Sequence, residues 1–106
     1  MRVMTPQQAR DSAERGEGVI IDVREAQEHV QASLPDVPLI PMSEFVERVG
    51  EVPTDRTIIV MCRSGARSEQ VALYLEQEHG VSDVVNMEGG ILAWATAGLP
   101  MEGVPS

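Results

Sequence analysis

Short runs of branched apolar residues are the clearest pattern along the chain. They cover residues 19–23, 57–61 and 84–85, and a weaker candidate covers 39–41. The first run, from Val19 to Val23, does not alternate apolar with polar positions, which is typical of a strand covered on both faces. We therefore predict short strands at these positions, with the most regular ones buried inside the protein.

Helical signals lie between these runs. Thr5 with Gln8 three residues later resembles a capping box, and Pro6 suits the first position of a helix. Further helices are predicted over 25–30, from a cap at Ser43 through Val49, over 68–78, where Ser68 could be the cap, and over 91–97. Because strands alternate with helices of crossover length, we expect an α/β fold. It would be one domain over residues 1–106, with a mainly parallel central sheet of about five strands and helices on both faces.

Composition narrows the range of partners. Eight arginines and no lysine stand against 17 acidic residues, so the net charge of the 106-residue chain is −9. Such a charge opposes binding to nucleic acid or to an anionic membrane surface. The first residues lack the apolar core of a secretory signal, and no run reaches the ~18 apolar residues of a membrane helix. We therefore expect a cytoplasmic protein with neither nucleic acid nor membrane as a partner.

Metal and cofactor sites find no support in the residue pattern. Cys62 is the only cysteine, so it cannot form an internal disulfide. With only His29 and His79 as further nitrogen ligands, no metal-binding spacing occurs. Trp94 and the six methionines are interpreted as core residues, so we expect no metal and no cofactor.

Cys62 is the strongest candidate for chemistry. It stands where the apolar run 57–61 gives way to a turn and a helix, with Arg63 beside it and Arg67 five residues on. Such a turn supplies converging backbone N–H groups, the positive end of a helix dipole and anion-binding guanidinium groups. Each of these favours the thiolate over the thiol, so the pattern predicts a reactive cysteine.

Asp22 and Arg24 are the candidates for supporting roles. In parallel sheets the ligand crevice lies beyond the carboxyl ends of the strands, and Asp22 and Cys62 both stand at such ends. If the two strands are neighbours, Asp22 and Arg24 approach the thiol loop. Structural roles fit equally well: Asp22 could cap the following turn, and Arg24 with Glu28 has the i,i+4 spacing of a helix pair.

Three separated stretches together resemble a single-domain rhodanese, a sulfurtransferase of the thiosulfate:cyanide type. They are residues 21–25 with Glu28, the loop 62–68 reading Cys-Arg-Ser-Gly-Ala-Arg-Ser, and residues 86–94 running on to 98–100. The chain departs from the family at residues 32–37, Ala-Ser-Leu-Pro-Asp-Val, where many members read Gly-His-Ile-Pro-Gly-Ala. This departure bears on local loop geometry more than on chemistry.

The resemblance implies a reaction through Cys62. Its thiolate would attack the outer sulfur of a small anionic donor such as thiosulfate, expel sulfite and become a persulfide. An external thiol, a dithiol protein or cyanide would then take the sulfur, since no second cysteine is present. The substrate-binding residues would be the rest of the loop, in which two arginines bind the sulfonate and the amides cradle the outer sulfur: Arg63, Ser64, Gly65, Ala66, Arg67 and Ser68.

Two other function classes remain open. A persulfide carrier or regulatory module, loaded by a partner protein and inactive on thiosulfate, would have the same loop. A cysteine-dependent phosphatase or arsenate reductase would resemble Cys-x-x-x-x-x-Arg, with five intervening residues. Here Arg67 follows Cys62 after four, and the shorter ring favours a single sulfur atom over a tetrahedral phosphate.

Overall fold

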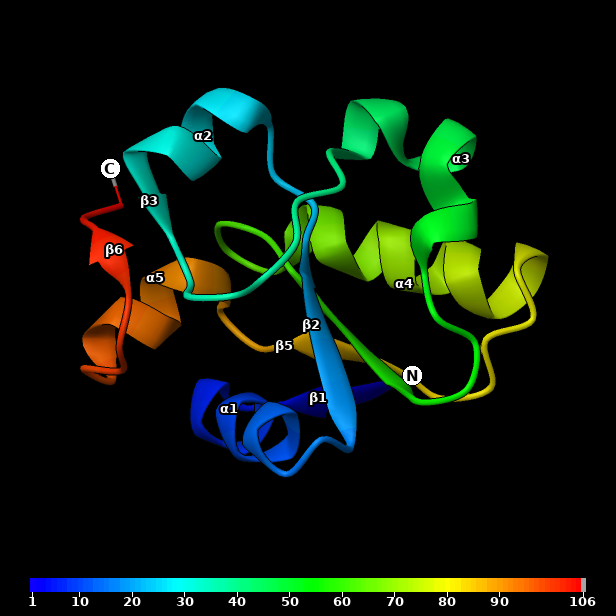
Figure 1. The fold of residues 1–106 in the computed structure, drawn as a ribbon, viewed down its shortest axis with the longest axis horizontal. Helices are drawn as coiled ribbons and strands as arrows, with labels where there is room; N and C mark the ends of the chain where they lie inside the picture. The colour runs from blue at the N-terminus through cyan, green and yellow to red at the C-terminus, as the bar shows by residue number, and fades with distance from the viewer. Residues whose placement is uncertain (106) are drawn as a thin grey trace.

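The computed structural model describes residues 1–105 as a layered α/β fold (Figure 1). The strands are β1 (Arg2–Met4), β2 (Gly18–Asp22), β3 (Ala32–Ser33), β4 (Thr57–Met61), β5 (Val84–Met87) and β6 (Glu102–Gly103). The α-helices are α1 (Pro6–Glu14), α2 (Ala26–Gln31), α3 (Phe45–Arg48), α4 (Ala66–Glu78) and α5 (Gly90–Thr96). Single 3₁₀ turns, Met42–Glu44 and Val49–Glu51, flank α3.

The central sheet is parallel and has the strand order β1-β5-β4-β2. The mainly parallel α/β architecture is therefore confirmed, although the sheet of the described residues has four strands where about five were expected. The predicted strand 39–41 reduces to one bridge between Leu39 and Asp22 at the edge of β2. β1 was not predicted, and β3 pairs with β6 as a separate antiparallel ribbon.

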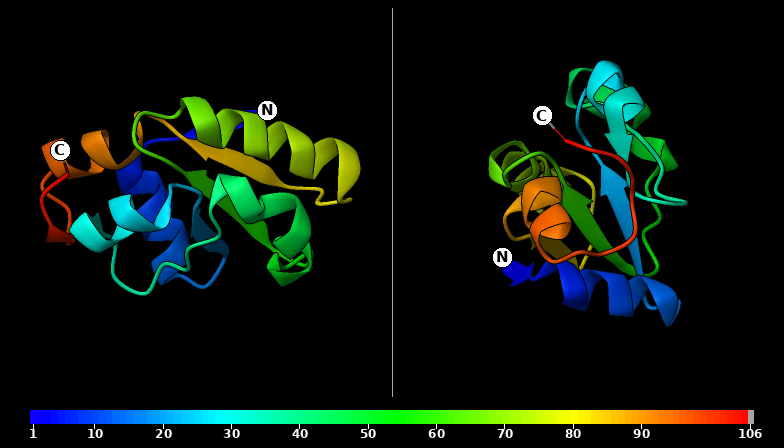
Figure 2. Two further views of the ribbon diagram at one scale, coloured as in Figure 1. Left: turned by 90° about the horizontal axis from the view of Figure 1, so that it is seen from above. Right: turned by 90° about the vertical axis from the view of Figure 1, so that its left-hand side faces the viewer.

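Helices cover both faces of the sheet, as expected. On one face Phe45 of α3 and Leu75 of α4 pack against alternate strand residues such as Val60. On the other, α1 and α5 pack against the intervening residues, with Trp94 and Ile59 in the same cluster. Figures 1 and 2 show α1 and α4 on opposite sides of the strands. Because β4 is buried on both faces, its side chains point alternately into two apolar layers.

The ends of two helices differ from the expectation. The capping box of Thr5 and Gln8 is confirmed at α1. Ser43, however, does not cap α3, because its hydroxyl donates to the Glu25 carboxylate at 2.6 Å. Ser68 lies within the first turn of α4 rather than at its cap, which is Gly65. The cap position has φ +103°, which glycine adopts without steric cost.

Candidate functional site

Cys62 directly follows β4, so it lies at the carboxyl end of this strand. Met61, the last residue of β4, lies opposite Asp22 of β2, so the two strands are neighbours as the sequence interpretation required. The chain then turns through Gly65 into α4, whose N-terminus faces back toward Cys62. The left-handed conformation of Gly65 makes this turn tight enough for the loop to curl around one atom.

Polar hydrogens of the loop converge on the Cys62 sulfur. The amide N–H of Gly65 lies 3.1 Å from Sγ and that of Ser68 lies 3.4 Å away. The Ser68 hydroxyl is 3.3 Å from the same sulfur. Burial raises the pKa of the Cys62 thiol, but the hydroxyl and the amides of Ser68, Gly65 and Ser64 outweigh it, so the net pKa is lowered from 9.0. These donors favour the thiolate form of Cys62 over the thiol.

Cys62 as a whole is only 1% exposed, so the loop and the apolar cluster beneath it enclose the residue almost completely. One side of the residue packs into the apolar cluster beneath α4, while the donors from Gly65 and Ser68 face the sulfur. The donors around Sγ distinguish Cys62 from a cysteine that is surrounded by apolar groups alone.

The start of α5 holds the base of the loop. The Ile91 N–H donates to the Cys62 carbonyl at 2.8 Å, and the Leu92 N–H donates to the Arg63 carbonyl at 3.2 Å. Gly90 has φ +62°, and a Cβ there would collide with both carbonyls. The glycine therefore permits the approach of backbone to backbone that fixes the loop.

Arg67 is held by a carboxylate from α2. Its two terminal nitrogens each donate to one oxygen of Glu28 at 2.8 Å. The hydrogen bond from Arg67 is the main cause that lowers the pKa of Glu28 to about 2. Glu28 correspondingly raises the pKa of Arg67. The second arginine of the predicted anion site is therefore positioned by a carboxylate 39 residues away in sequence.

Asp22 and Arg24 form a buried network next to the loop rather than within it. Asp22 is 0% and Arg24 2% exposed, and the guanidinium donates to both carboxylate oxygens of Asp22 at 2.8–3.2 Å. Arg24 also donates to the carbonyls of Ala32 and Glu28, and His29 Nδ1 lies 3.0 Å from Asp22. This network ties α2 to the end of β2, and α2 carries the carboxylate that binds Arg67.

The remaining loop residues differ in exposure. Arg63, Ser64 and Ala66 are exposed, and Gly65 is partly buried. Asn86 of β5 was not predicted as a site residue, yet its side chain contacts both Gly65 and Ser68. Two sequence signals were available for it: its place near the end of a strand beside the expected crevice, and its position at the start of the stretch 86–94 that carries the family resemblance.

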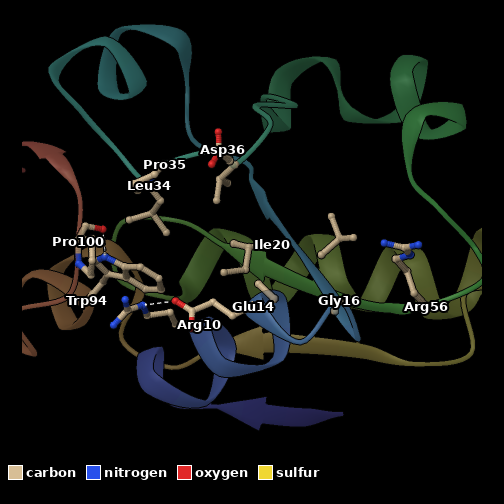
Figure 3. Close-up of a pocket in the computed structure, with 14 residues that line it drawn as sticks. Arg10, Glu14, Gly16, Ile20, Leu34, Pro35, Asp36, Arg56, Trp94 and Pro100 are labelled. Carbon is tan, nitrogen blue, oxygen red and sulfur yellow. Dashed lines mark hydrogen bonds and ion pairs between the residues drawn. The ribbon is translucent and has the colours of Figure 1, made fainter.

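A cavity lies away from the Cys62 loop. It has a volume of about 520 Å³ and is bounded by α1, the first half of β2, the loop around Asp36 and the Trp94 side chain (Figure 3). Arg10 and Glu14, which form an ion pair, flank it. None of the loop residues 62–68 lines this cavity, so it is separate from the thiol site.

The described residues hold no cluster of three His, Cys, Asp or Glu side chains suited to a metal ion. Among residues 1–105, no helix has both the length and the apolar character needed to span a membrane.

Comparisons with known proteins agree with the geometry. A family model described as a rhodanese-like domain matches residues 5–97. A sulfurtransferase of Allochromatium vinosum is 43% identical over 83 residues, which cover 78% of this chain and 77% of that protein. Thiosulfate sulfurtransferase GlpE of Pseudomonas syringae pv. syringae is 32% identical over 91 residues, covering 86% of this chain and 84% of that protein.

A solved structure gives the same result. The crystal structure of a rhodanese-related protein from Thermoplasma volcanium superposes with a TM-score of 0.86 at 29% identity, covering 95% of this chain and 97% of that one. The family match extends over most of the chain, and the sulfurtransferase relatives align over more than two thirds of it. This chain therefore belongs to the rhodanese-like domain family of sulfurtransferases.

Proposed function

We propose that this protein transfers a sulfane sulfur from thiosulfate, or a similar small anionic donor, to an external acceptor through a persulfide on Cys62. The observation that carries the proposal is the convergence of the Gly65 and Ser68 amides on the Cys62 sulfur. These donors stabilise negative charge on sulfur both before and after the transfer. The thiosulfate sulfurtransferase among the relatives supports the choice of donor.

The reaction has two balanced steps. In the first, the Cys62 thiolate attacks the outer sulfur of thiosulfate, a new S–S bond forms, and the old S–S bond breaks with its electron pair leaving on sulfite. In the second, an external thiolate or cyanide attacks the outer persulfide sulfur and the Cys62 thiolate is regenerated. The acceptor is external because the chain has a single cysteine. We expect a small thiol or a dithiol protein of the cytoplasm in this role.

The two arginines of the loop bind the donor. Arg67 lies near enough to the thiol for its charge to couple to that of Cys62, and Arg63 follows Cys62 directly. Since the chain carries a net charge of −9, positive potential for a dianion must come from these side chains and the loop amides. Ser64, Gly65, Ala66 and Ser68 would supply the amides. Asp22 and Arg24 support the site by fixing α2.

Intact-protein mass measurement tests the proposal directly. Incubation with thiosulfate should add the mass of one sulfur atom, cyanide should remove it, and Cys62→Ala should show no gain. Loading only from a persulfidated partner protein would instead indicate a carrier, and turnover of an aryl phosphate without sulfur uptake would indicate a phosphatase. Either of these results would overturn the proposed reaction with thiosulfate.

The donor-binding assignment has its own test. Arg63→Ala and Arg67→Ala should each raise the KM for thiosulfate while thermal unfolding shows that the fold is kept. Arg10→Ala is the matched control, since it makes the same change in net charge at a residue of α1 paired with Glu14. Full activity of both loop variants at low thiosulfate would refute the assignment.

A further inference from the structure

The Asn86 side chain bridges two groups of the Cys62 loop. Its Nδ2 lies 3.0 Å from the carbonyl oxygen of Gly65, and its Oδ1 lies 2.6 Å from the hydroxyl oxygen of Ser68. Asn86 is only 6% exposed, so water has little access to these contacts. The bridge therefore joins β5 to the two residues whose amides point at the Cys62 sulfur.

The orientation of the Asn86 amide follows from the chemistry of the Gly65 carbonyl. A carbonyl oxygen can only accept, and this one already accepts the Glu69 N–H at 3.2 Å. A rotated Asn86 amide would place two acceptor oxygens against each other. Nδ2 must therefore face Gly65, which leaves Oδ1 facing Ser68, so the Ser68 hydroxyl must be the donor in that contact.

The Ser68 hydroxyl consequently has one proton and two acceptors within reach. Asn86 Oδ1 is 2.6 Å away and the Cys62 sulfur is 3.3 Å away. When the sulfur carries no charge, the short bond to an amide oxygen is the stronger one. When the sulfur is a thiolate, a charge-assisted bond competes, because ionised acceptors bind roughly twice as strongly as neutral ones.

We propose that Asn86 is a positioning residue that controls the direction of the Ser68 hydroxyl: the hydroxyl donates to Asn86 Oδ1 while the Cys62 sulfur is uncharged, and it turns to donate to the sulfur when the sulfur becomes a thiolate. Asn86 thereby competes with the thiolate for one donor. When Sγ becomes the uncharged inner atom of a persulfide, the Ser68 hydroxyl again donates to Asn86 Oδ1. This inference rests on the proposed role of Cys62 as the nucleophile and adds a residue that sets its ionisation.

Replacing Asn86 leaves the charged side chains of Arg67 and Glu28 near the thiol unchanged. Arg67 couples to Cys62 and is paired with Glu28 through both of its terminal nitrogens, whereas the Asn86 side chain bonds to Gly65 and Ser68. The Gly65 carbonyl also keeps its bond from α4 when the Asn86 side chain is removed. A change in the Cys62 pKa on replacing Asn86 therefore reports on the Ser68 hydroxyl.

The test is a double-mutant cycle read by thiol titration, using thiolate ultraviolet absorbance and the pH dependence of alkylation. Asn86→Ala frees the Ser68 proton for sulfur and should lower the Cys62 pKa by about half to one unit, which is about three to ten times more thiolate below the midpoint. Ser68→Ala should raise the pKa. In the Ser68→Ala background, Asn86→Ala should have no further effect.

The opposite results would overturn the inference. If Asn86 only supports the loop, Asn86→Ala should raise the Cys62 pKa, and the shift should persist without the Ser68 hydroxyl. Should Asn86→Ala fail to fold, Asn86→Leu offers a similarly branched side chain without an acceptor and carries the same expectation. An unchanged pKa in Ser68→Ala would also refute the proposal. Thiol titration needs no sulfur donor, so its outcome is independent of whether thiosulfate is a substrate.

Discussion

Glu28→Gln tests how much the Glu28–Arg67 ion pair contributes to the free energy of unfolding and how far it weakens binding of the sulfur donor by Arg67. Two hydrogen bonds of 2.8 Å join the side chains, and the pKa of Glu28 falls from 4.5 to about 2. Taken in full, this change corresponds to about 3 kcal/mol. The two side chains are 26% and 34% exposed, so solvent screening reduces the expected loss in the variant to about 1 kcal/mol.

The same substitution should improve donor binding. In the wild type, the Glu28 carboxylate competes with the donor's sulfonate for the Arg67 guanidinium and repels a dianion. Glu28→Gln should therefore lower the KM for thiosulfate about two- to five-fold, equivalent to about 0.4–1 kcal/mol. The assay is thiocyanate formation with cyanide as acceptor, beside denaturant unfolding. Glu69→Gln, which removes one exposed charge from the first turn of α4, is the matched control.

Two results would refute this reasoning. A KM that matches the Glu69→Gln control, or rises, would show that Arg67 does not bind the donor. The second check is acid titration of stability. Because the folded pKa of Glu28 is below its ordinary value, the pair stabilises fully above pH 4.5 and its contribution is lost toward pH 2. The stability gap between wild type and Glu28→Gln should close over that range, and a constant gap would assign it to packing.

Three further predictions follow from backbone and thiol geometry. Gly90→Ala should destabilise the fold by more than about 3 kcal/mol and abolish sulfur loading, because the new Cβ collides with the Arg63 carbonyl. Gly80→Ala is the control: its Cβ meets open space, so it should cost only about 1 kcal/mol of left-handed backbone strain. Equal losses of unfolding free energy in denaturant would refute this difference. Asp36→Gly should stabilise by about 0.5–1 kcal/mol, since Asp36 has φ +60°, and a lower unfolding midpoint would contradict it. Alkylation of Cys62 should titrate with a midpoint below 9.0, and a midpoint at or above 9.0 would contradict the loop electrostatics.

Much of the fold could be predicted from the sequence because its signals are local. Buried parallel strands require continuous branched apolar runs, and β2 and β4 carry them. The capping box of Thr5 and Gln8 also lies within one helical turn. β1, by contrast, has three residues with two of them exposed, so it lacks an apolar run and owes its place to pairing with β5.

The parts of the site that the sequence did not reveal depend on tertiary contacts. The pairing of Arg67 with Glu28 joins a loop to a helix 39 positions away. Ser68 resembled a helix cap, but its side chain instead faces Cys62 and Asn86 because Gly65 already begins α4 in a left-handed conformation. Residue spacing alone does not distinguish these arrangements from ordinary caps and surface pairs.

The departure from the rhodanese pattern at residues 32–37 has a structural explanation. Asp36 stands where many family members carry glycine, and it adopts the left-handed conformation that a glycine there would favour. Aspartate is among the few other residues that tolerate this region, because its short polar side chain can bond locally. The left-handed Asp36 carries a modest energetic cost, and this cost falls beside the cavity at Trp94 rather than at Cys62.

Two sets of hydrogen-bond donors have different tasks at the site: the loop donors stabilise the Cys62 thiolate, and the arginine side chains bind the anionic sulfur donor. Glu28 balances the charge of Arg67, so the Ser68 hydroxyl and the amides of Ser68 and Gly65 are the donors that lower the pKa of Cys62. Such fixed dipoles in a buried loop are screened by salt much less than exposed guanidinium groups are. Added salt should therefore weaken thiosulfate binding far more than it shifts the Cys62 pKa. A parallel change in both quantities would mean that the arginines, and not the amides, hold the thiolate.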